Sequence, residues 1–492
     1  MFFSVYTLGC KLNQVESEAI TDSFCREGFT FVPWDTLKRR PALSSAEPWL
    51  MVINTCTVTS MAEQKARRFI RRLLREHSAM CVIITGCYAQ VEQAELAALE
   101  PSGKGEAPLG PGRLFVIPGD SKDRLLDLPR LLAVSGNHET ALPHLISSWL
   151  DSLSINPPPA DSPPKGEDGS FRLQPENFAS HSRAFLKVQD GCDKRCAYCR
   201  VSIARGKSRS LGAAEALTTL KALEKRGFAE AVIAGVNITQ YHDSLPAALE
   251  LDGLLGYLLA GTETIRLRLS SLEPDWLTPA RLAEFSSILA HPRVRPHFHL
   301  SVQSGSAGII AKMARSYTPA DIERAAEMFR SVRNDPFLAC DIIAGFPGET
   351  EEDFAKTLSL CERIGFAWIH AFPFSPRPGT AARDFPERVS ERDTATRVQQ
   401  LTELARKGRR EYIARWEGKE VEAVVEAVNE RLVPEENLDH LPRRMVPAVS
   451  ENYLKLLIIS NDSPPPGSLI RCRISGGKLP ADPRFDAIAE IC

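Results

Sequence analysis

Three cysteines crowd into the stretch GCDKRCAYC, residues 191–199: Cys192, Cys196 and Cys199. Thiolates this close are typical of metal ligands or of a redox pair, and Cys196 and Cys199 have thioredoxin-type spacing. A redox pair leaves Cys192 without a role, and a closed zinc site needs a fourth ligand that is not evident nearby. An iron–sulfur cluster explains all three thiolates, since three irons take them and the fourth iron stays open. The spacing favours the cluster and leaves the other two as alternatives.

A second set of three cysteines is dispersed over the first part of the chain. Cys10, Cys56 and Cys87 each stand at the end of an apolar run, in YTLGC, VINTC and IITGC. If these runs are parallel strands of one sheet, their carboxyl ends lie along one edge, which is where such sheets bind ligands. One such cysteine is typically a small buried residue. Three at equivalent strand ends predict a shared site in one crevice.

Short apolar strands alternating with helical patterns must position this second set. Strands are predicted over 2–8, 49–54 and 81–85, with the helical patterns VESEAITDSFCREG and MAEQKARRFIRRLLREH between them. The alternation predicts a parallel α/β unit over residues 1–135. Residues 136–182 include NPPPADSPPKGEDGS and are predicted to be a linker, because Pro, Gly, Ser and charged residues dominate that stretch.

The first set of cysteines belongs to a larger block, residues 183–416. Six candidate strands run from AFLKV to WIHAFPF with helical stretches between them, which predicts a partial (β/α)6 barrel. The cysteines follow its first strand, and therefore lie at the carboxyl ends of the strands, the reactive face of such barrels. From Gly418 onward, runs such as YLKLLII predict a small all-β module over 418–480. The expected fold class is α/β with this β module appended.

Composition sets limits on the kind of protein. The 492 residues suffice for two or three domains with sizeable cores, and a net charge of -2 leaves open a local basic patch for nucleic acid. The apolar runs are far shorter than the ~18 residues of a membrane helix, and no charged leader precedes the first one. We expect a cytoplasmic protein without a membrane span, where clustered cysteines are more typical of metal sites than of disulfides.

The motif Cys-x3-Cys-x2-Cys with Tyr198 before its last cysteine resembles that of radical S-adenosylmethionine enzymes. The resemblance implies a 4Fe–4S cluster on Cys192, Cys196 and Cys199 whose open iron is chelated by S-adenosylmethionine, the source of a 5'-deoxyadenosyl radical. Polar residues at the ends of the predicted barrel strands then become possible contacts to S-adenosylmethionine, and structural hydrogen bonding is equally open for each. They are Asn237, Glu273, Gln303 and Ser304.

A closer resemblance extends over most of the chain. TLGCKLNQVESE, VINTCTVTSMAEQKARRFIRR and TGCYAQ resemble the N-terminal domain of methylthiotransferases, and ARGKSRS, AGVNITQY and DIIAGFPGETEEDF continue the likeness. This family implies a second 4Fe–4S cluster on Cys10, Cys56 and Cys87, whose open iron carries the sulfur to be inserted. The last block resembles the TRAM module, a small RNA-binding barrel. CRVSIARG departs from the Ile and Pro usual after the last barrel cysteine, which bears on packing beside the cluster.

The predicted activity is therefore replacement of a C–H on a tRNA adenine by C–S–CH3. The expected cofactors are two 4Fe–4S clusters and S-adenosylmethionine, and the expected partners are the tRNA anticodon stem-loop and an electron donor such as flavodoxin or ferredoxin. The alternatives are a radical enzyme whose second cluster only relays electrons, and a zinc-stabilised RNA-binding protein without catalysis.

The first cysteine loop indicates which nucleoside is modified. GCKLNQVESE, with Lys11 after Cys10 and Glu16 before Ser17, resembles the group that acts on threonylcarbamoyladenosine at position 37 of tRNA. A threonylcarbamoyl carboxylate suits a cationic pocket, whereas the isopentenyl group of the alternative substrate prefers apolar walls.

Overall fold

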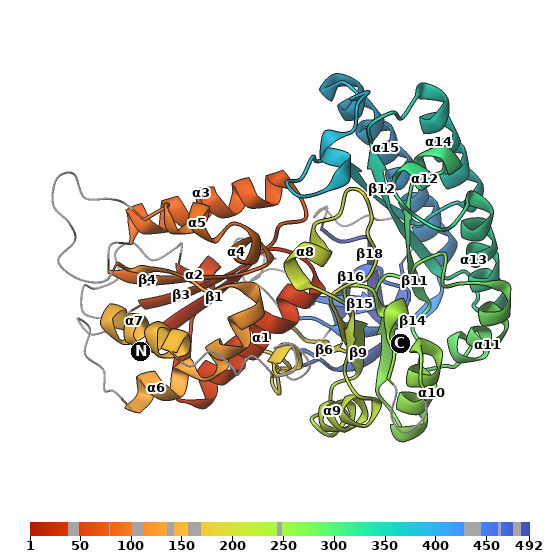
Figure 1. Cartoon of the computed structure of the whole chain (residues 1–492). Helices are drawn as coiled ribbons and strands as arrows, with labels where there is room; N and C mark the ends of the chain where they lie inside the picture. Colours follow the sequence, from red (N-terminus) through yellow and green to blue (C-terminus); the bar gives the residue numbers. More distant parts are fainter. Residues whose placement is uncertain are drawn as a thin grey trace.

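The computed structural model describes residues 1–37, 49–77, 79–100, 112–134, 142–155, 169–243, 248–427, 444–460, 464–475 and 484–492. Figure 1 shows an α/β unit in red and orange, a half-open barrel in yellow to cyan, and a blue β module behind the two. None of the described helices combines the length and the apolar character needed to cross a membrane.

A parallel sheet in the order β2-β1-β3-β4-β5 forms the first unit. Its three longer strands are the predicted ones, and apolar helix faces cover both sides, with Phe24 of α1 on one face and Ile70 of α3 on the other. The strands are β1 (Phe2–Thr7), β2 (Thr30–Phe31), β3 (Trp49–Thr55), β4 (Met80–Gly86) and β5 (Leu114–Val116). The helices are α1 (Lys11–Arg26), α2 (Trp34–Leu37), α3 (Ser60–Glu76), α4 (Cys87–Val91), α5 (Gln93–Ala97), the 3₁₀ helix η1 (Gly119–Leu126) and α6 (Leu128–Val134).

The segment predicted to be a linker contains structure that belongs to this unit. Helix α7 (Leu142–Ile155) and the 3₁₀ helix η3 (Gly169–Phe171) both fall within 136–182. Leu142, Ile146 and Trp149 recur at helical spacing and pack into the same core as Phe3. The linker prediction is wrong for this helix, because the Pro-rich composition farther along masked an amphipathic pattern. Most of that Pro-rich stretch, residues 156–168, lies outside the described residues.

Six parallel strands build the second unit and confirm the predicted partial barrel. Two sheets, β10-β9-β6 and β11-β12-β13, are joined by parallel bridges from Leu267 to Val294 and from Leu272 to Leu300. The strands are β6 (Ala184–Lys187), β9 (Glu230–Ala234), β10 (Arg266–Leu269), β11 (His297–Gln303), β12 (Phe337–Ala344) and β13 (Trp368–Pro373), beside a short ribbon of β7 (Gln189–Asp190) and β8 (Arg209–Ser210).

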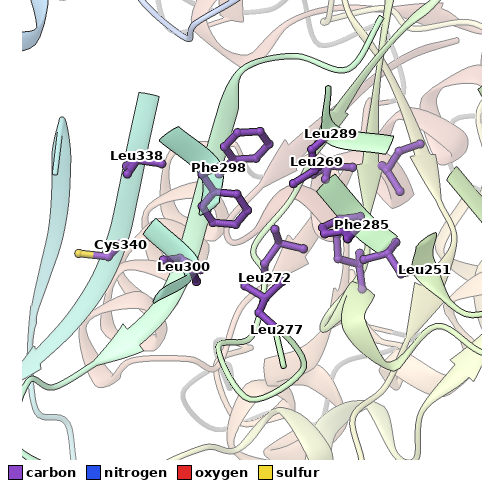
Figure 2. Close-up of a cluster of buried hydrophobic side chains, with 14 of the residues drawn as sticks. Leu251, Leu269, Leu272, Leu277, Phe285, Leu289, Phe298, Leu300, Leu338 and Cys340 are labelled. Carbon is purple, nitrogen blue, oxygen red and sulfur yellow. The ribbon is translucent and has the colours of Figure 1, made fainter. Parts of the chain in front are cut away.

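Helices line the outside of this barrel, and leucines and phenylalanines fill the space between helices and strands. Figure 2 shows Phe298 and Leu300 of β11 facing Leu272, Leu277 and Phe285, all of them buried. Burial of this apolar surface is the main stabilisation of the unit. The helices are α8 (Val201–Arg205), α9 (Ala213–Lys225), η4 (Ile238–Gln240), α10 (Leu251–Gly261), α11 (Pro279–Leu289), α12 (Ala307–Lys312), α13 (Pro319–Val332), α14 (Glu351–Ile364), η5 (Ala381–Asp384) and α15 (Glu391–Trp416).

The third unit is a closed β-barrel in the order β14-β15-β16-β18-β17. Tyr412 and Trp416 of α15 and Phe337 of β12 share its core, so the module is packed against the larger barrel. Its strands are β14 (Glu420–Val425), β15 (Arg444–Ser450), β16 (Lys455–Ser460), β17 (Leu469–Ile474) and β18 (Ala487–Ile491). The predicted range 418–480 stops short, because β18 pairs with both β16 and β17 and closes the barrel.

Candidate active site

Cys10, Cys56 and Cys87 lie at the carboxyl ends of three neighbouring strands, β1, β3 and β4. Cys10 precedes the first residue of α1, Cys56 follows β3 directly, and Cys87 begins α4. All three line one cavity. The structure therefore brings together three cysteines that are dispersed in the sequence.

Two of the three loops that carry this trio have a glycine directly before the cysteine. Gly9 has a φ of 133° and Gly86 a φ of 97°, conformations that side chains rarely adopt. A Cβ on Gly86 would lie 2.4 Å from both the Asn54 Oδ1 and the Thr55 carbonyl oxygen. The Gly-Cys pairs are needed because the chain must turn sharply while passing against its neighbouring strand.

Arg205 of α8 connects this trio to the barrel. Its Nε donates a hydrogen bond to the Cys87 Sγ at 3.2 Å, and its Nη2 donates to the Asn13 Oδ1 at 2.8 Å. The Asn13 side-chain amide in turn donates to the carbonyls of Leu8 and Thr55, at 2.9 and 3.0 Å. One buried arginine thus contacts a thiol of the trio and the asparagine that joins two of its loops.

A buried charge network surrounds Arg205. Glu16 contacts Lys122 at 2.5 Å, Lys187 at 3.1 Å and Arg205 at 2.9 Å, and Asp190 contacts Lys187 at 2.6 Å and Arg205 at 2.9 Å. Burial alone would raise the pKa of both carboxyls, but the cations hold the pKa of Glu16 and of Asp190 well below its usual range. Three cations facing two carboxylates leave positive charge beside Cys87, which suits an anionic group bound to its sulfur.

The other trio lies in the loop between β7 and α8. The Cys192 N–H donates to the Gly206 carbonyl at 3.0 Å, which closes the loop at its base. Arg315 Nη1 donates to the Cys196 Sγ at 3.2 Å, and its Nη2 pairs with Glu273 Oε2 at 2.7 Å. A guanidinium held by a carboxylate therefore contacts a sulfur in this trio, as in the other.

Both trios fit iron–sulfur clusters in their chemistry. Burial raises the pKa of the Cys56 and Cys199 thiols to about 12, so a cation must replace the proton for either to act as a thiolate near neutral pH. Backbone N–H groups of Val58 and Val201 donate to these sulfurs at 3.5 and 3.4 Å. Hydrogen bonds to the sulfurs are among the interactions that tune protein-bound iron–sulfur clusters.

The spacing of the sulfurs disfavours a single zinc ion. Thiolates around one tetrahedral zinc lie ~3.8 Å apart, given a Zn–S bond of about 2.3 Å. Among the described residues, the group that places three ligand atoms within 4.8 Å of one another is His299, Asp341 and His370, and neither cysteine trio does so. Neither trio therefore has the sulfur spacing that one tetrahedral zinc ion requires.

One cavity of about 1240 Å³ connects the first trio with all three units of the chain. The cysteines, Asn13 and Arg205 form part of its lining. A second part, the far wall, is defined as the cations and aromatic rings that come from β11, β12, β13, α15 and the closed barrel. Its residues include His297, His299, Asp341, Trp368, His370, Phe372, Arg406, Arg409, Arg410, Tyr453, Lys455 and Arg484.

Two family models match the sequence: "Radical SAM superfamily" over residues 186–361 and "Uncharacterized protein family UPF0004" over residues 3–104. The Threonylcarbamoyladenosine tRNA methylthiotransferase MtaB of Treponema pallidum is 40% identical over 96% of this chain and 97% of its own length. The MtaB protein of Aquifex aeolicus is 31% identical over 88% of this chain and 94% of its own. The chain belongs to the MtaB family of tRNA methylthiotransferases. Among solved structures, the radical S-adenosylmethionine methyltransferase TsrM of Kitasatospora setae aligns with a TM-score of 0.49 and 16% identity, over 78% of this chain and 75% of that one.

In this MtaB-family chain, the four predicted S-adenosylmethionine contacts have different surroundings. Asn237 accepts hydrogen bonds from Thr239, and burial raises the pKa of the Cys192 thiol while a hydrogen bond from the Asn237 side chain opposes that rise. Glu273 pairs with Arg315, as described above. Gln303 has a φ of 62° at an irregularity in β11, and the buried Ser304 hydroxyl accepts from the Ser306 N–H at 3.2 Å. None of the four lines the cavity. Their role toward the cosubstrate stays a prediction.

Sequence reasoning missed several residues of this MtaB-family site. Arg205 and Arg315 contact cysteine sulfurs, and nothing in their local sequence distinguishes them from surface arginines. Asp341 and His370 could have been noticed, because they are polar residues inside otherwise apolar strands, and His299 lies in a strand that alternates polar and apolar residues. His299 Nε2 lies 3.1 Å from Asp341 Oδ1, and Trp368 Nε1 donates to His370 Nδ1 at 3.3 Å.

Proposed function

We propose that this protein converts N6-threonylcarbamoyladenosine at position 37 of tRNA to its 2-methylthio derivative. The observation that carries the proposal is that three cysteines line the same cavity as a set of cations and aromatic rings. That arrangement suits a base held against a sulfur-bearing centre. The names of the MtaB relatives support the same nucleoside.

Cys10, Cys56 and Cys87 would hold one 4Fe–4S cluster, and Cys192, Cys196 and Cys199 the other, with S-adenosylmethionine bound beside the second set. When bound, these groups supply the radical, the sulfur and the methyl group of the reaction. The side chains of the protein hold and shield them. Arg205 and Arg315 donate to one sulfur in each set, and Cys56 and Cys87 are themselves buried.

The far wall of the cavity is suited to RNA. Arg406 and Arg410 lie on α15 and Lys455 lies on the closed barrel, so cations from two units face the same space, while Arg409 is paired with Asp486. Cations bind phosphates, and aromatic rings such as Trp368 stack on unpaired bases. We propose that the anticodon stem-loop docks here, and that the closed barrel is the TRAM-like RNA-binding module predicted from the sequence.

The remaining parts of the reaction follow from the substrate. We propose that the enzyme acts on tRNA in the cytoplasm, and that a small electron carrier such as flavodoxin or ferredoxin reduces the S-adenosylmethionine-binding cluster. Anaerobically purified protein should contain iron and sulfide in equal amounts, about eight of each per chain if both clusters are 4Fe–4S. About one zinc without sulfide would instead support the non-catalytic alternative.

Nucleoside analysis of tRNA tests the substrate. Deleting the gene should abolish 2-methylthio-N6-threonylcarbamoyladenosine and leave the methylthio-isopentenyl nucleoside unchanged. Loss of the isopentenyl derivative alone would overturn the choice of nucleoside and leave the reaction type standing. Loss of neither would overturn the proposed activity.

A further inference from the structure

Lys11 follows Cys10 directly in the chain. It begins α1 and lines the same cavity as the thiol trio. The groups with which it interacts electrostatically include Tyr453 of the closed barrel and His297, Asp341 and His370 of the larger barrel. Its charge is therefore felt by residues of both other units that line the same cavity.

The ammonium group of Lys11 has no carboxylate partner within the described part of the chain, although acids are near. Glu230 forms ion pairs with Arg268 at 2.6 Å and with Arg295 at 2.9 Å. Asp341 lies 3.1 Å from His299. The nearby carboxylates are thus engaged by other cations or hydrogen-bond donors. Lys11 therefore makes no close ion pair with a described residue, and an anionic ligand in the cavity would supply one.

A second polar group in the same place lacks a partner. His297 is only 2% exposed and lines the cavity, and its Nδ1 has no hydrogen-bond partner among the described residues. Its ring stacks on Tyr453 with centroids 4.1 Å apart. Buried polar atoms are nearly always satisfied in native proteins. A ligand that reaches past Lys11 would complete the hydrogen bonding of this wall.

We propose that Lys11 binds the carboxylate of the threonylcarbamoyl group, with His297 and Tyr453 enclosing the rest of that substituent. The inference rests on the proposed function, since it assigns a subsite for the same nucleoside. Adenine carries its N6 substituent on the same six-membered ring as C2. A base whose C2 faces the cysteine trio has an orientation in which this substituent lies beside Cys10, where Lys11 lies, and this orientation is the one proposed to bind. An isopentenyl group at this place would bury the ammonium without an anion.

The test compares two anticodon stem-loop RNAs, one carrying threonylcarbamoyladenosine and one carrying its neutral carboxamide. Lys11→Met should lower kcat/KM for the acid about 10- to 100-fold, the range of a charge-assisted hydrogen bond. It should change kcat/KM for the carboxamide less than about threefold. Lys11→Arg, which keeps the charge, should recover most of the activity. Iron and sulfide content must match wild type, because Cys10 is adjacent.

Two other lysines serve as comparisons. Lys455→Met removes a cation from the same cavity and should lower kcat/KM for both RNAs by the same factor, as expected for a phosphate contact. Lys225→Met, on the exposed end of α9, should change neither. An equal loss on both RNAs for Lys11→Met, or no loss, would overturn the subsite. If the wild-type enzyme does not methylthiolate the threonylcarbamoyl RNA, the proposed function is wrong. The dissociation constants of wild type and Lys11→Met for the two RNAs then still decide whether Lys11 binds the carboxylate.

Discussion

Glu16 offers the sharpest test of the structure, because the sequence and the structure predict different roles for it. In the sequence, Glu16 before Ser17 resembles the group of enzymes that acts on threonylcarbamoyladenosine. In the structure it is fully buried, away from the cavity, and contacts Lys122, Lys187 and Arg205. We predict that Glu16→Gln destabilises the protein without altering the choice of nucleoside, since the side chain pairs with buried cations and does not line the cavity.

The expected magnitude follows from the charges that remain. Removing the Glu16 carboxylate leaves Asp190 to face three buried cations. Breaking a buried ion pair by removing one partner typically costs about 3–5 kcal/mol. We therefore expect a loss in that range at neutral pH. Glu27→Gln, an exposed substitution just after the same helix, should cost less than about 0.5 kcal/mol.

Urea denaturation of cluster-free protein measures this loss, with wild type and both variants compared in the same buffer. The pKa of Glu16 is below 4.5 in the folded state, so its stabilisation is fully present above about pH 4.5 and is lost as the pH falls further. The difference between wild type and Glu16→Gln should therefore shrink in acid. A loss under about 1 kcal/mol at pH 7, or one that grows in acid, would refute the buried network as described.

Further predictions concern the trios and the loops that carry them. Cys196→Ala should abolish reductive cleavage of S-adenosylmethionine, whereas Cys56→Ala should retain cleavage and lose only methylthiolation; normal product from Cys56→Ala would contradict an essential second cluster. Gly86→Ala should lower the iron content and the thermal unfolding midpoint, because its Cβ would clash with Asn54 and Thr55. Arg410→Ala should weaken tRNA binding and reduce the slope of affinity against salt concentration, measured by titration.

Local patterns in the sequence were enough for the main elements and for the cysteines. The strands β1, β3 and β4 are short apolar runs, and β6 to β13 alternate with amphipathic helices at periods that are read over a few residues. Because parallel strands end at a common edge, the position of a cysteine after each strand already implied that Cys10, Cys56 and Cys87 converge. Local composition misled only where Pro-rich sequence followed α7 and where β18 lay beyond the expected end.

Tertiary structure decided which charged residues surround the cysteines. Arg205 meets Cys87 across 118 positions, and Lys187 meets Glu16 across 171. No periodicity encodes such pairs, because a buried ion pair depends on which faces of distant elements come together, and a lysine or an arginine looks the same in the sequence whether it is buried or solvated. The cavity has the same origin. Lys11, His297 and Tyr453 come from three units and share a wall only because the closed barrel packs against the larger one.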